Sequence, residues 1–440
     1  MKKYFFLLIY FFLTSYCIAN TINSRSCNQV DIQNAINISK DGDIISVPAG
    51  DCSWTSPNPV TVINKNIQII GAGNDKTIIH LTKGNGFNFN ISNKPKFRIS
   101  GFNFTGKPTD ATISVVQTSL AAPVIGWRID NNKFDYGKIL QPGDVIQVRG
   151  VSYGLIDHNN FIMTSGVAII LWQFLDREDG GGTFNNFGAF GSYSYSLPYS
   201  FGSQFAVYIE DNTFVNTIRT SRNFAVHDSS AGGGRSVFRY NKVTGGYFYV
   251  HWARNGEIGG QLNEIYNNTF IGNKGYDEYF ARIEAGTGVI FNNTVRMNST
   301  PPNKPYVMLD DRRADGSEAN PPLNRCSEKN PWDGNGDSQA PGWPCYNQIG
   351  RSTGKTWQNI THRKSTSAPF YLWNNGIEAG CSSHGQCNDI LNVFATPAAY
   401  IKSIPHPNGE IDYANHKRMP KYTPFIYPYP LNNGMPVVSH

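Results

Sequence analysis

The sequence of 440 residues has no strong excess of charge of either sign. Its 38 Lys and Arg residues face 32 Asp and Glu residues, and loss of the leader described below removes two lysines, leaving 38 − 2 − 32 = +4. Nucleic-acid-binding domains concentrate basic residues far more strongly, so this composition argues against a nucleic-acid partner. It is compatible with an anionic glycan.

Long hydrophobic runs are also missing, apart from one short stretch at the N-terminus. The run from Tyr4 to Leu13 follows two lysines and is too short to span a membrane. Small residues, Cys17 and Ala19, occupy positions −3 and −1 of a cut after Ala19. These features predict a signal peptide over residues 1–19, no membrane span, and a secreted, periplasmic or cell-surface protein.

Closely spaced cysteine pairs are absent, which argues against a zinc knuckle. The chain has seven cysteines, and the leader contains one of them. An even number in an exported chain suggests disulfides. Proximity in the sequence favours three pairs, although other connectivities stay open: Cys27–Cys52, Cys326–Cys345 and Cys381–Cys387.

What the sequence does contain is a short pattern that recurs about every 27 residues. An apolar residue precedes an asparagine and another apolar residue follows it, with steps of 27, 27, 26, 29, 27 and 25 residues, at Asn132, Asn159, Asn186, Asn212, Asn241, Asn268 and Asn293. A fixed period of this size indicates a solenoid. Asparagine suits a tight bend between two strands, and stacked asparagines can bond one another in a ladder.

The two ends of the chain differ from the repeats. Val30 to Ser39 carries apolar residues on one helical face, which predicts a helix capping the open end of the solenoid. Residues 299–440 lack the repeat and hold four cysteines and many prolines, although Phe370 to Asn375 reads as one last coil. We therefore expect a parallel β-helix over 20–298 and a loop-rich, disulfide-containing C-terminal extension over 299–440, packed on the helix.

The stretch from Val30 to Ile79 and the Ile-x-x-Asn-x-Phe coils resemble the right-handed parallel β-helix proteins of the pectate-lyase superfamily, over roughly residues 28–298. The resemblance implies an all-β, single-stranded parallel β-helix with three strands per coil and the asparagines at the bend between the second and third strands. Lyases, hydrolases, esterases, phage tailspikes and adhesins share this fold, so the resemblance implies a fold more than one reaction.

In each coil another strand precedes the two strands that the asparagine bend joins. Four of these can be aligned by their alternation of inward and outward residues: Val145–Arg149, Phe224–His227, Phe248–His251 and Ala281–Glu284. One predicted outward column contains Arg149, His227, His251 and Glu284. The column beside it contains Gln147, Ala225, Tyr249 and Arg282. Because the last three coils are sequential, we expect His227, His251 and Glu284 to stack at about 4.8 Å per coil.

This cluster is our candidate catalytic site for a polysaccharide lyase acting on a uronate-containing glycan. A lyase needs a cation to neutralise the substrate carboxylate, a role for Arg282, and a base to remove the neighbouring proton, a role for His251 or Tyr249. His227 would share the proton load. Glu284 would orient His251 or bind calcium.

Other side chains are candidates for binding. The predicted substrate-binding residues are Arg149, Trp252, Arg254 and Glu257. No cofactor is required by the sequence, and calcium is the candidate, with Asp176, Asp179 and Asp228 as its candidate ligands. The first two of these aspartates lack the spacing of a calcium motif, so a plain surface charge run is the favoured explanation for them.

Two alternatives stay open. A glycoside hydrolase would need two carboxylates, for which Glu284 and Asp228 are available, although Asp228 is expected to begin a loop. A non-catalytic adhesin would bind glycans through its tyrosine-rich loops. Asp310 and Asp311 are expected to form an exposed turn.

Short motifs of known lyases match only in part. Ala281–Gly286 resembles the Leu-Arg-His-Gly segment of alginate and chondroitin lyases, which implies a role for Arg282, but the lysine base expected with it has no match. The Arg-x-Pro-x-x-Arg motif of pectate lyases and the Gly-His-Gly motif of polygalacturonases are absent. Asp157 resembles a calcium ligand of pectate lyases, but Asp130 and Glu210 share its register, which favours a structural position.

Overall fold

The computed structural model describes residues 19–433, except for 95, 118–122, 139–142, 174–199, 219–223, 231–232, 252–258, 273–278, 298–305, 311–324, 328–329, 333–348, 353–365, 378–391, 397–400, 402 and 406–408. Several predictions concern side chains outside the described residues: those of the signal peptide up to residue 18, Asp176, Asp179, Asn186, Trp252, Arg254, Glu257, Asp311, Cys326, Cys345, Cys381 and Cys387. No helix in the described part of the chain is long and apolar enough to cross a membrane.

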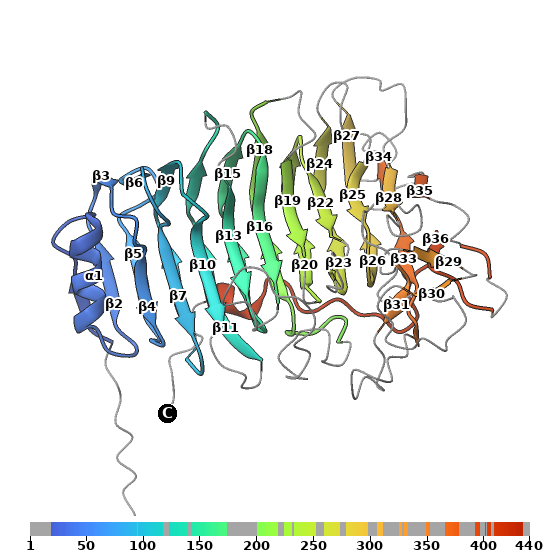
Figure 1. The fold of residues 1–440 in the computed structure, drawn as a ribbon, viewed down its shortest axis with the longest axis horizontal. Helices are drawn as coiled ribbons and strands as arrows, with labels where there is room; N and C mark the ends of the chain where they lie inside the picture. The colour runs from blue at the N-terminus through green and yellow to red at the C-terminus, as the bar shows by residue number, and fades with distance from the viewer. Residues whose placement is uncertain are drawn as a thin grey trace, which may run out of the picture.

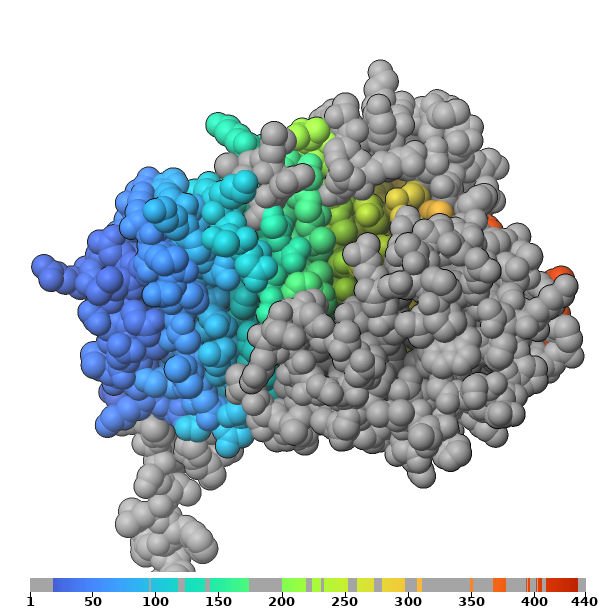
Figure 2. All heavy atoms as spheres, in the orientation of Figure 1, coloured from blue at the N-terminus to red at the C-terminus, as the bar shows by residue number. Residues whose placement is uncertain are grey.

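The described strands form a solenoid in which each coil adds one strand to each of three parallel sheets, A, B and C (Figure 1). The predicted all-β parallel β-helix is therefore confirmed. Figure 2 shows the coils following one another along the molecule in sequence order. Two short antiparallel pairs lie outside the three sheets: β29 (Arg325–Ser327) with β30 (Asn330–Trp332), and β31 (Arg351–Ser352) with β32 (Thr366–Ser367).

Sheet A contains the strands that precede the asparagine bends: β1 (Thr21–Asn23), β2 (Ile44–Val47), β5 (Gln68–Gly71), β8 (Arg98–Ser100), β11 (Val124–Asp130), β14 (Ser152–Asp157), β17 (Val207–Glu210), β20 (Arg235–Arg239), β23 (Leu262–Tyr266), β26 (Thr287–Phe291), β33 (Phe370–Trp373) and β36 (Tyr413–Asn415). Sheet B follows the bends: β3 (Gly50–Trp54), β6 (Thr77–Leu81), β9 (Asn103–Gly106), β12 (Lys133–Asp135), β15 (Asn160–Met163), β18 (Thr213–Asn216), β21 (Lys242–Thr244), β24 (Thr269–Gly272), β27 (Thr294–Met297) and β34 (Gly376–Ile377). Sheet C completes each coil: β4 (Val60–Ile63), β7 (Phe87–Ile91), β10 (Ala111–Gln117), β13 (Asp144–Arg149), β16 (Gly166–Trp172), β19 (Phe224–Ser229), β22 (Tyr247–Val250), β25 (Tyr279–Ile283), β28 (Tyr306–Asp310) and β35 (Asn392–Thr396).

The core is a column of inward side chains that repeats from coil to coil. Phe104, Phe134, Phe161 and Phe214 are fully buried, and their rings stack in succession at 5.5, 4.8 and 4.7 Å between centroids. Stacked aromatic pairs contribute about 0.5–1.5 kcal/mol each beyond the area that they bury. The phenylalanines that follow these bends therefore hold neighbouring coils in register.

The asparagine ladder is present and joins seven coils. The side-chain amide of each rung donates to the side-chain oxygen of the next at 2.9–3.2 Å, through Asn132, Asn159, Asn212, Asn241, Asn268, Asn293 and Asn375. The residue before each rung has a left-handed backbone, with φ between 52° and 57°. The rungs are buried, so these bonds fix the bends at one spacing.

One predicted rung was wrong. Asn159 bonds directly to Asn212 across 53 residues, and β14 and β15 pair with β17 and β18. The ladder therefore passes over Asn186, which lies outside the described residues, and the sequence period counted one rung too many. The Phe370–Asn375 prediction was right, since β33 extends sheet A and Asn375 ends the ladder.

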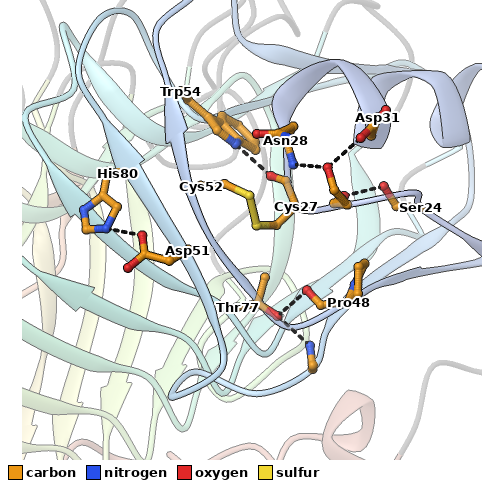
Figure 3. Close-up of a disulfide and its surroundings, with 12 residues drawn as sticks. Ser24, Cys27, Asn28, Asp31, Pro48, Asp51, Cys52, Trp54, Thr77 and His80 are labelled. Carbon is orange, nitrogen blue, oxygen red and sulfur yellow. Dashed lines mark hydrogen bonds and ion pairs between the residues drawn. A yellow bond between two sulfur atoms is a disulfide. The ribbon is translucent and has the colours of Figure 1, made fainter.

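The solenoid also continues past residue 298, because β28, β33, β34, β35 and β36 join the three sheets. The predicted boundary between β-helix and extension was therefore too early. At the other end, α1 (Gln29–Ile38) lies against β2 and β4 with Ile32, Ala35 and Ile36 buried (Figure 1). The predicted Cys27–Cys52 disulfide joins this region to β3, and the Trp54 indole donates to the Cys27 carbonyl at 3.0 Å (Figure 3).

The end of the chain runs back over the outer face of sheet A. We call residues 417–433 the strap; it ends in the short helix η4 (Pro430–Asn433) near β11 and β14 (Figure 1). Arg239 donates to the carbonyls of Phe425 and Ile426 at 2.8 and 2.9 Å. Arg128 donates to the carbonyls of Leu431 and Asn432 in the same way, so the strap covers several consecutive coils.

Candidate active site on the outer face of sheet C

Strand register brings most of the predicted cluster together on the outer face of sheet C. The central column of outward residues runs through Gln147, Ile170, Asp228, Tyr249, Arg282 and Met308. His251 and Glu284 directly follow β22 and β25, two residues beyond Tyr249 and Arg282. The predicted neighbours Tyr249, His251, Arg282 and Glu284 therefore lie on adjacent coils.

The prediction for His227 was wrong. The pairing of β19 with β22 shifts by one residue between Ala225 and His227, so His227 lies opposite Phe248. Its side chain is fully buried, with its ring 4.8 Å from that of Phe248. Burial lowers its pKa to about 3, which keeps it neutral. The same shift turns Asp228 outward, into the column where we expected Ala225.

Arg282 is the centre of a charged network. Its guanidinium lies 2.7 Å from Glu284 Oε1 and also forms an ion pair with Asp310. Tyr249 donates its hydroxyl hydrogen to Glu284 Oε2 at 2.7 Å. Arg282 therefore holds a fixed position over the sheet, with its side chain 13% exposed.

His251 faces the other side of the same group. Its Nδ1 lies 3.4 Å from Asp228 Oδ2, and its ring lies 4.9 Å from that of Tyr249. The His251 side chain is 28% exposed, whereas that of Asp228 is 7% exposed. The buried Oδ1 of Asp228 has no hydrogen-bond partner among the described residues. Asp228 is thus placed to orient the imidazole and to stabilise its protonated form.

The surroundings determine the protonation of these groups. Burial and the Glu284 carboxylate raise the pKa of Tyr249 well above its usual value, so its hydroxyl stays protonated. Burial lowers the pKa of Arg282, but the neighbouring Glu284, Tyr249 and Asp310 together raise it by more. The net pKa lies above its usual value, so Arg282 stays a cation. Arg282 faces Glu284 and Asp310, Asp228 faces His251, and the formal charges of the group sum to 1 − 3 = −2 with His251 neutral.

A second polar group lies on sheet C three coils away. Arg149 lies 4.8 Å from the ring centre of Trp172, the residue beside it on β16, and 3.4 Å from Asp110. Gln147 donates to Asp110 and to Asp144 at 2.9 and 3.2 Å. Burial, with the nearby Asp228 and Asp110 charges, raises the pKa of Asp144 to about 6.

The described residues do not fit a calcium site. No three of their acidic, His or Cys side chains converge as metal ligands. Of the carboxylates at the site, Glu284 and Asp310 are already paired with Arg282, and Asp228 Oδ1 has no hydrogen-bond partner among the described residues. Calcium ligation through Asp228 or Glu284 therefore finds no support in the described part of the chain.

Two residues of the site were misjudged from the sequence. Asp228 lies within β19 and not at the start of a loop, because the register shift could not be read from alternation. Asp310 is buried at the end of β28 and not in an exposed turn. The alternation in Tyr306-Val-Met-Leu-Asp310 was a signal that could have found it, since Val307 and Leu309 point inward.

The acidic residues on sheet A are structural, as their shared register suggested. Asp130, Asp157 and Glu210 lie opposite one another on consecutive strands and are fully buried. Arg98, Arg128 and Arg239 each bond one of them at 2.5–2.8 Å. These pairs satisfy the carboxylates within the chain.

No protein-family model and no curated protein matches this sequence. Among solved structures, the chain is similar to an alginate lyase from Paenibacillus sp. str. FPU-7, at 15% identity over 66% of this chain and 97% of the other, with a TM-score of 0.37. It is also similar to a PL6 alginate lyase in complex with a trisaccharide, at 12% identity over 86% of this chain and 84% of the other, with a TM-score of 0.41. A third similar structure is the PL6 family polysaccharide lyase Pedsa3628 from Pseudopedobacter saltans, at 12% identity over 92% of this chain and 97% of the other, with a TM-score of 0.36. Likeness at this level concerns the solenoid architecture and not the reaction.

Proposed function

We propose that this chain is an exported polysaccharide lyase that cleaves a uronate-containing glycan on the outer face of sheet C. The observation that carries the proposal is the convergence of a permanent cation, a histidine paired with a carboxylate, and a protonated tyrosine on three consecutive coils. These are Arg282, His251 with Asp228, and Tyr249. β-Elimination requires these three kinds of group.

Arg282 binds the uronate carboxylate and so acidifies the C5–H bond. His251 removes that proton through Nε2, while Asp228 holds the ring by Nδ1. The C5–H electrons form the C4–C5 double bond, and the C4–O bond breaks. Tyr249 donates its proton to the leaving oxygen. Transfer of the proton on His251 back to Tyr249 through solvent restores the starting state, so no proton is gained or lost overall.

Tyr249 suits the acid role better than the base role. A base must be deprotonated before the reaction, and both burial and Glu284 oppose ionisation of this tyrosine. In the absence of substrate its hydroxyl donates a hydrogen bond to Glu284, and the same proton is available to a leaving oxygen. We therefore assign the base to His251.

The polar group around Arg149 extends the proposed site along sheet C. Trp172 lies two coils from β22 in the stack, at about 4.8 Å per coil, so a sugar chain lying along the solenoid axis reaches both places. Arg149 would bind a second uronate, and the Trp172 ring would pack against a sugar face. This arrangement favours a long glycan over a single sugar unit.

The excess of carboxylates favours a second candidate, a glycoside hydrolase. Glu284 and Asp310 both pair with Arg282, and Asp228 lies beside Tyr249 on the next coil, so an anionic substrate must compete with two carboxylates for the guanidinium. A hydrolase acting on a neutral glycan would use two of these groups as acid and base or nucleophile. Glu284 and Asp228 remain the pair for that role.

The test is incubation of the full exported chain with pectate, alginate and glycosaminoglycans, with and without Ca²⁺, followed by ultraviolet detection of unsaturated uronate ends. A lyase produces these ends, and His251→Ala abolishes them. New reducing ends without ultraviolet absorbance would favour the hydrolase. No cleavage with retained glycan binding would favour an adhesin.

A further inference from the structure

A groove of about 410 Å³ lies away from sheet C, at the bend between sheets A and B. It spans four consecutive coils and is lined by Asp211, Tyr240, Asn241, Lys242, Asn267, Thr269, Ile271 and Arg296. The register places Lys242 opposite Thr269 on β24, and Ile271 opposite Arg296 on β27. The two cations therefore lie diagonally across the groove, two coils apart, at about 4.8 Å per coil.

The groove combines the side chains that recognise an acidic sugar. Lys242 and Arg296 are exposed, so their charges are accessible to a ligand. Thr269 and Asn267 add a hydroxyl and an amide between them, and Asn267 sits at a left-handed bend with φ 56°. Hydrogen bonds to charged groups are stronger than neutral ones, so carboxylates are the favoured ligands.

One end of the groove is fixed by the strap. Tyr240 is 37% exposed, and its ring stacks on that of Tyr427 at 3.7 Å between centroids. Tyr427 donates to Asp211 Oδ1 at 2.8 Å, so the acidic group of the lining is already engaged. The formal charges of the lining residues sum to 2 − 1 = +1, whereas the site on sheet C carries a net negative charge.

We propose that this groove is an accessory binding site for a uronate-bearing oligosaccharide, separate from the site of cleavage. The proposal takes its ligand class from the proposed function, but it depends on different residues. A second site on another face of the solenoid would keep the enzyme attached to a polymer between cleavage events. Long substrates would therefore benefit from it, and short ones would not.

The experiment is calorimetric titration of the full chain, in the His251→Ala background so that the ligand is not consumed. The probes are guluronate and galacturonate hexasaccharides, with maltohexaose as the neutral control. Lys242→Ala with Arg296→Ala should weaken one binding event at least tenfold. Asp211→Asn should strengthen the same event, because it removes the one negative charge and keeps an acceptor for Tyr427.

Lys133→Ala is the matched control, because Lys133 lies in the same outward column of sheet B, three coils from Lys242. It should leave binding unchanged. Binding that is insensitive to Lys242 and Arg296, or equal binding of maltohexaose, overturns the inference even if cleavage is observed. Loss of a uronate-binding event with these variants, in a chain that cleaves nothing, supports the groove and rejects the lyase.

Discussion

The outer faces of sheets A and C carry the same kinds of side chain, but the strap covers only the polar residues of sheet A. On sheet A, Arg239 and Glu210 are fully buried, and both bond to the strap backbone. On sheet C, Arg282 and His251 keep 13% and 28% of their side chains exposed. Arginine, carboxylate and tyrosine side chains thus form buried structural contacts on sheet A and a solvent-accessible cluster on sheet C.

The comparison shows that residue type alone does not identify a site. A charge whose hydrogen bonds are all made by its own chain under a cover has no position left for a ligand. A charge paired at the edge of solvent can exchange its partner for a substrate. We therefore expect changes on sheet C to affect activity, and changes on sheet A to affect stability.

The largest effect is expected for the catalytic residues on sheet C. His251→Ala or Arg282→Ala should reduce kcat/KM by about a hundredfold to ten-thousandfold, which is the usual contribution of an acid–base group. Thermal unfolding of His251→Ala should change little, because that side chain is 28% exposed. Arg282→Ala should also lower Tm, because it leaves the buried Glu284 without its cation. Initial rates and Tm measured on the same preparations check this, and a large fall in Tm for His251→Ala would assign that residue a structural role instead.

Arg239→Met should have the converse effect. It leaves Glu210 buried without its cation and removes two bonds to the strap. Breaking a buried pair costs about 3–5 kcal/mol, so the free energy of unfolding in urea should fall by that amount. Arg98→Met is the control, because Arg98 is partly exposed and should cost less. If Arg239→Met instead reduced activity without loss of stability, the division between the faces would be wrong.

Glu264 should make the strap sensitive to pH. Burial raises its pKa from 4.5 to about 7, although the Tyr422 hydroxyl and Gly202 amide that bond to it act in the opposite direction. The folded chain then holds a proton that the unfolded chain has lost, so stability falls as pH rises from about 4.5 to 7, by up to about 3 kcal/mol.

Glu264→Gln should flatten this part of the pH dependence and leave the rest. Asp144 on sheet C contributes with the same sign at lower pH, so the measured quantity is the difference between the two proteins across a series of urea titrations. Identical slopes for both would show that Glu264 titrates normally.

The smallest effect comes from a matched pair of tyrosines, each of which donates to a buried glutamate. Tyr422 bonds to Glu264 under the strap, and Tyr249 bonds to Glu284 in the candidate site. Tyr422→Phe should cost about 1–2 kcal/mol of stability and leave turnover unchanged. Tyr249→Phe should reduce kcat with a smaller change in stability. A pH–rate profile separates the two, and the same profile for both variants would contradict the distinction.

The fold was predictable because its determinants are local. Each Asn sits beside a left-handed residue in one bend, so the pattern is visible within six residues. Alternation also placed Tyr249, His251, Arg282 and Glu284 correctly. It failed at β19, where a shift of one residue exchanged the roles of His227 and Asp228. Such a shift depends on pairing with another coil and leaves no mark on the strand's own sequence.

Other features could not be predicted because they depend on contacts across long stretches of chain. Asn186 fits the pattern, but the ladder passes from Asn159 to Asn212. Arg128 donates a hydrogen bond to Asn432, which lies 304 residues later in the chain. In the sequence, that region was recognisable only as a proline-rich tail. The expectation that this tail packs along the solenoid was right, but the face that it covers became visible only in the structure.

The most direct test of the central proposal is to run the cleavage reaction in water enriched in heavy oxygen and to weigh the products by mass spectrometry. Elimination at His251 and Arg282 breaks the glycosidic bond without adding water. We therefore expect unsaturated products that contain no heavy oxygen and that disappear in the His251→Ala variant. Saturated products carrying one heavy oxygen at the new reducing end would contradict it.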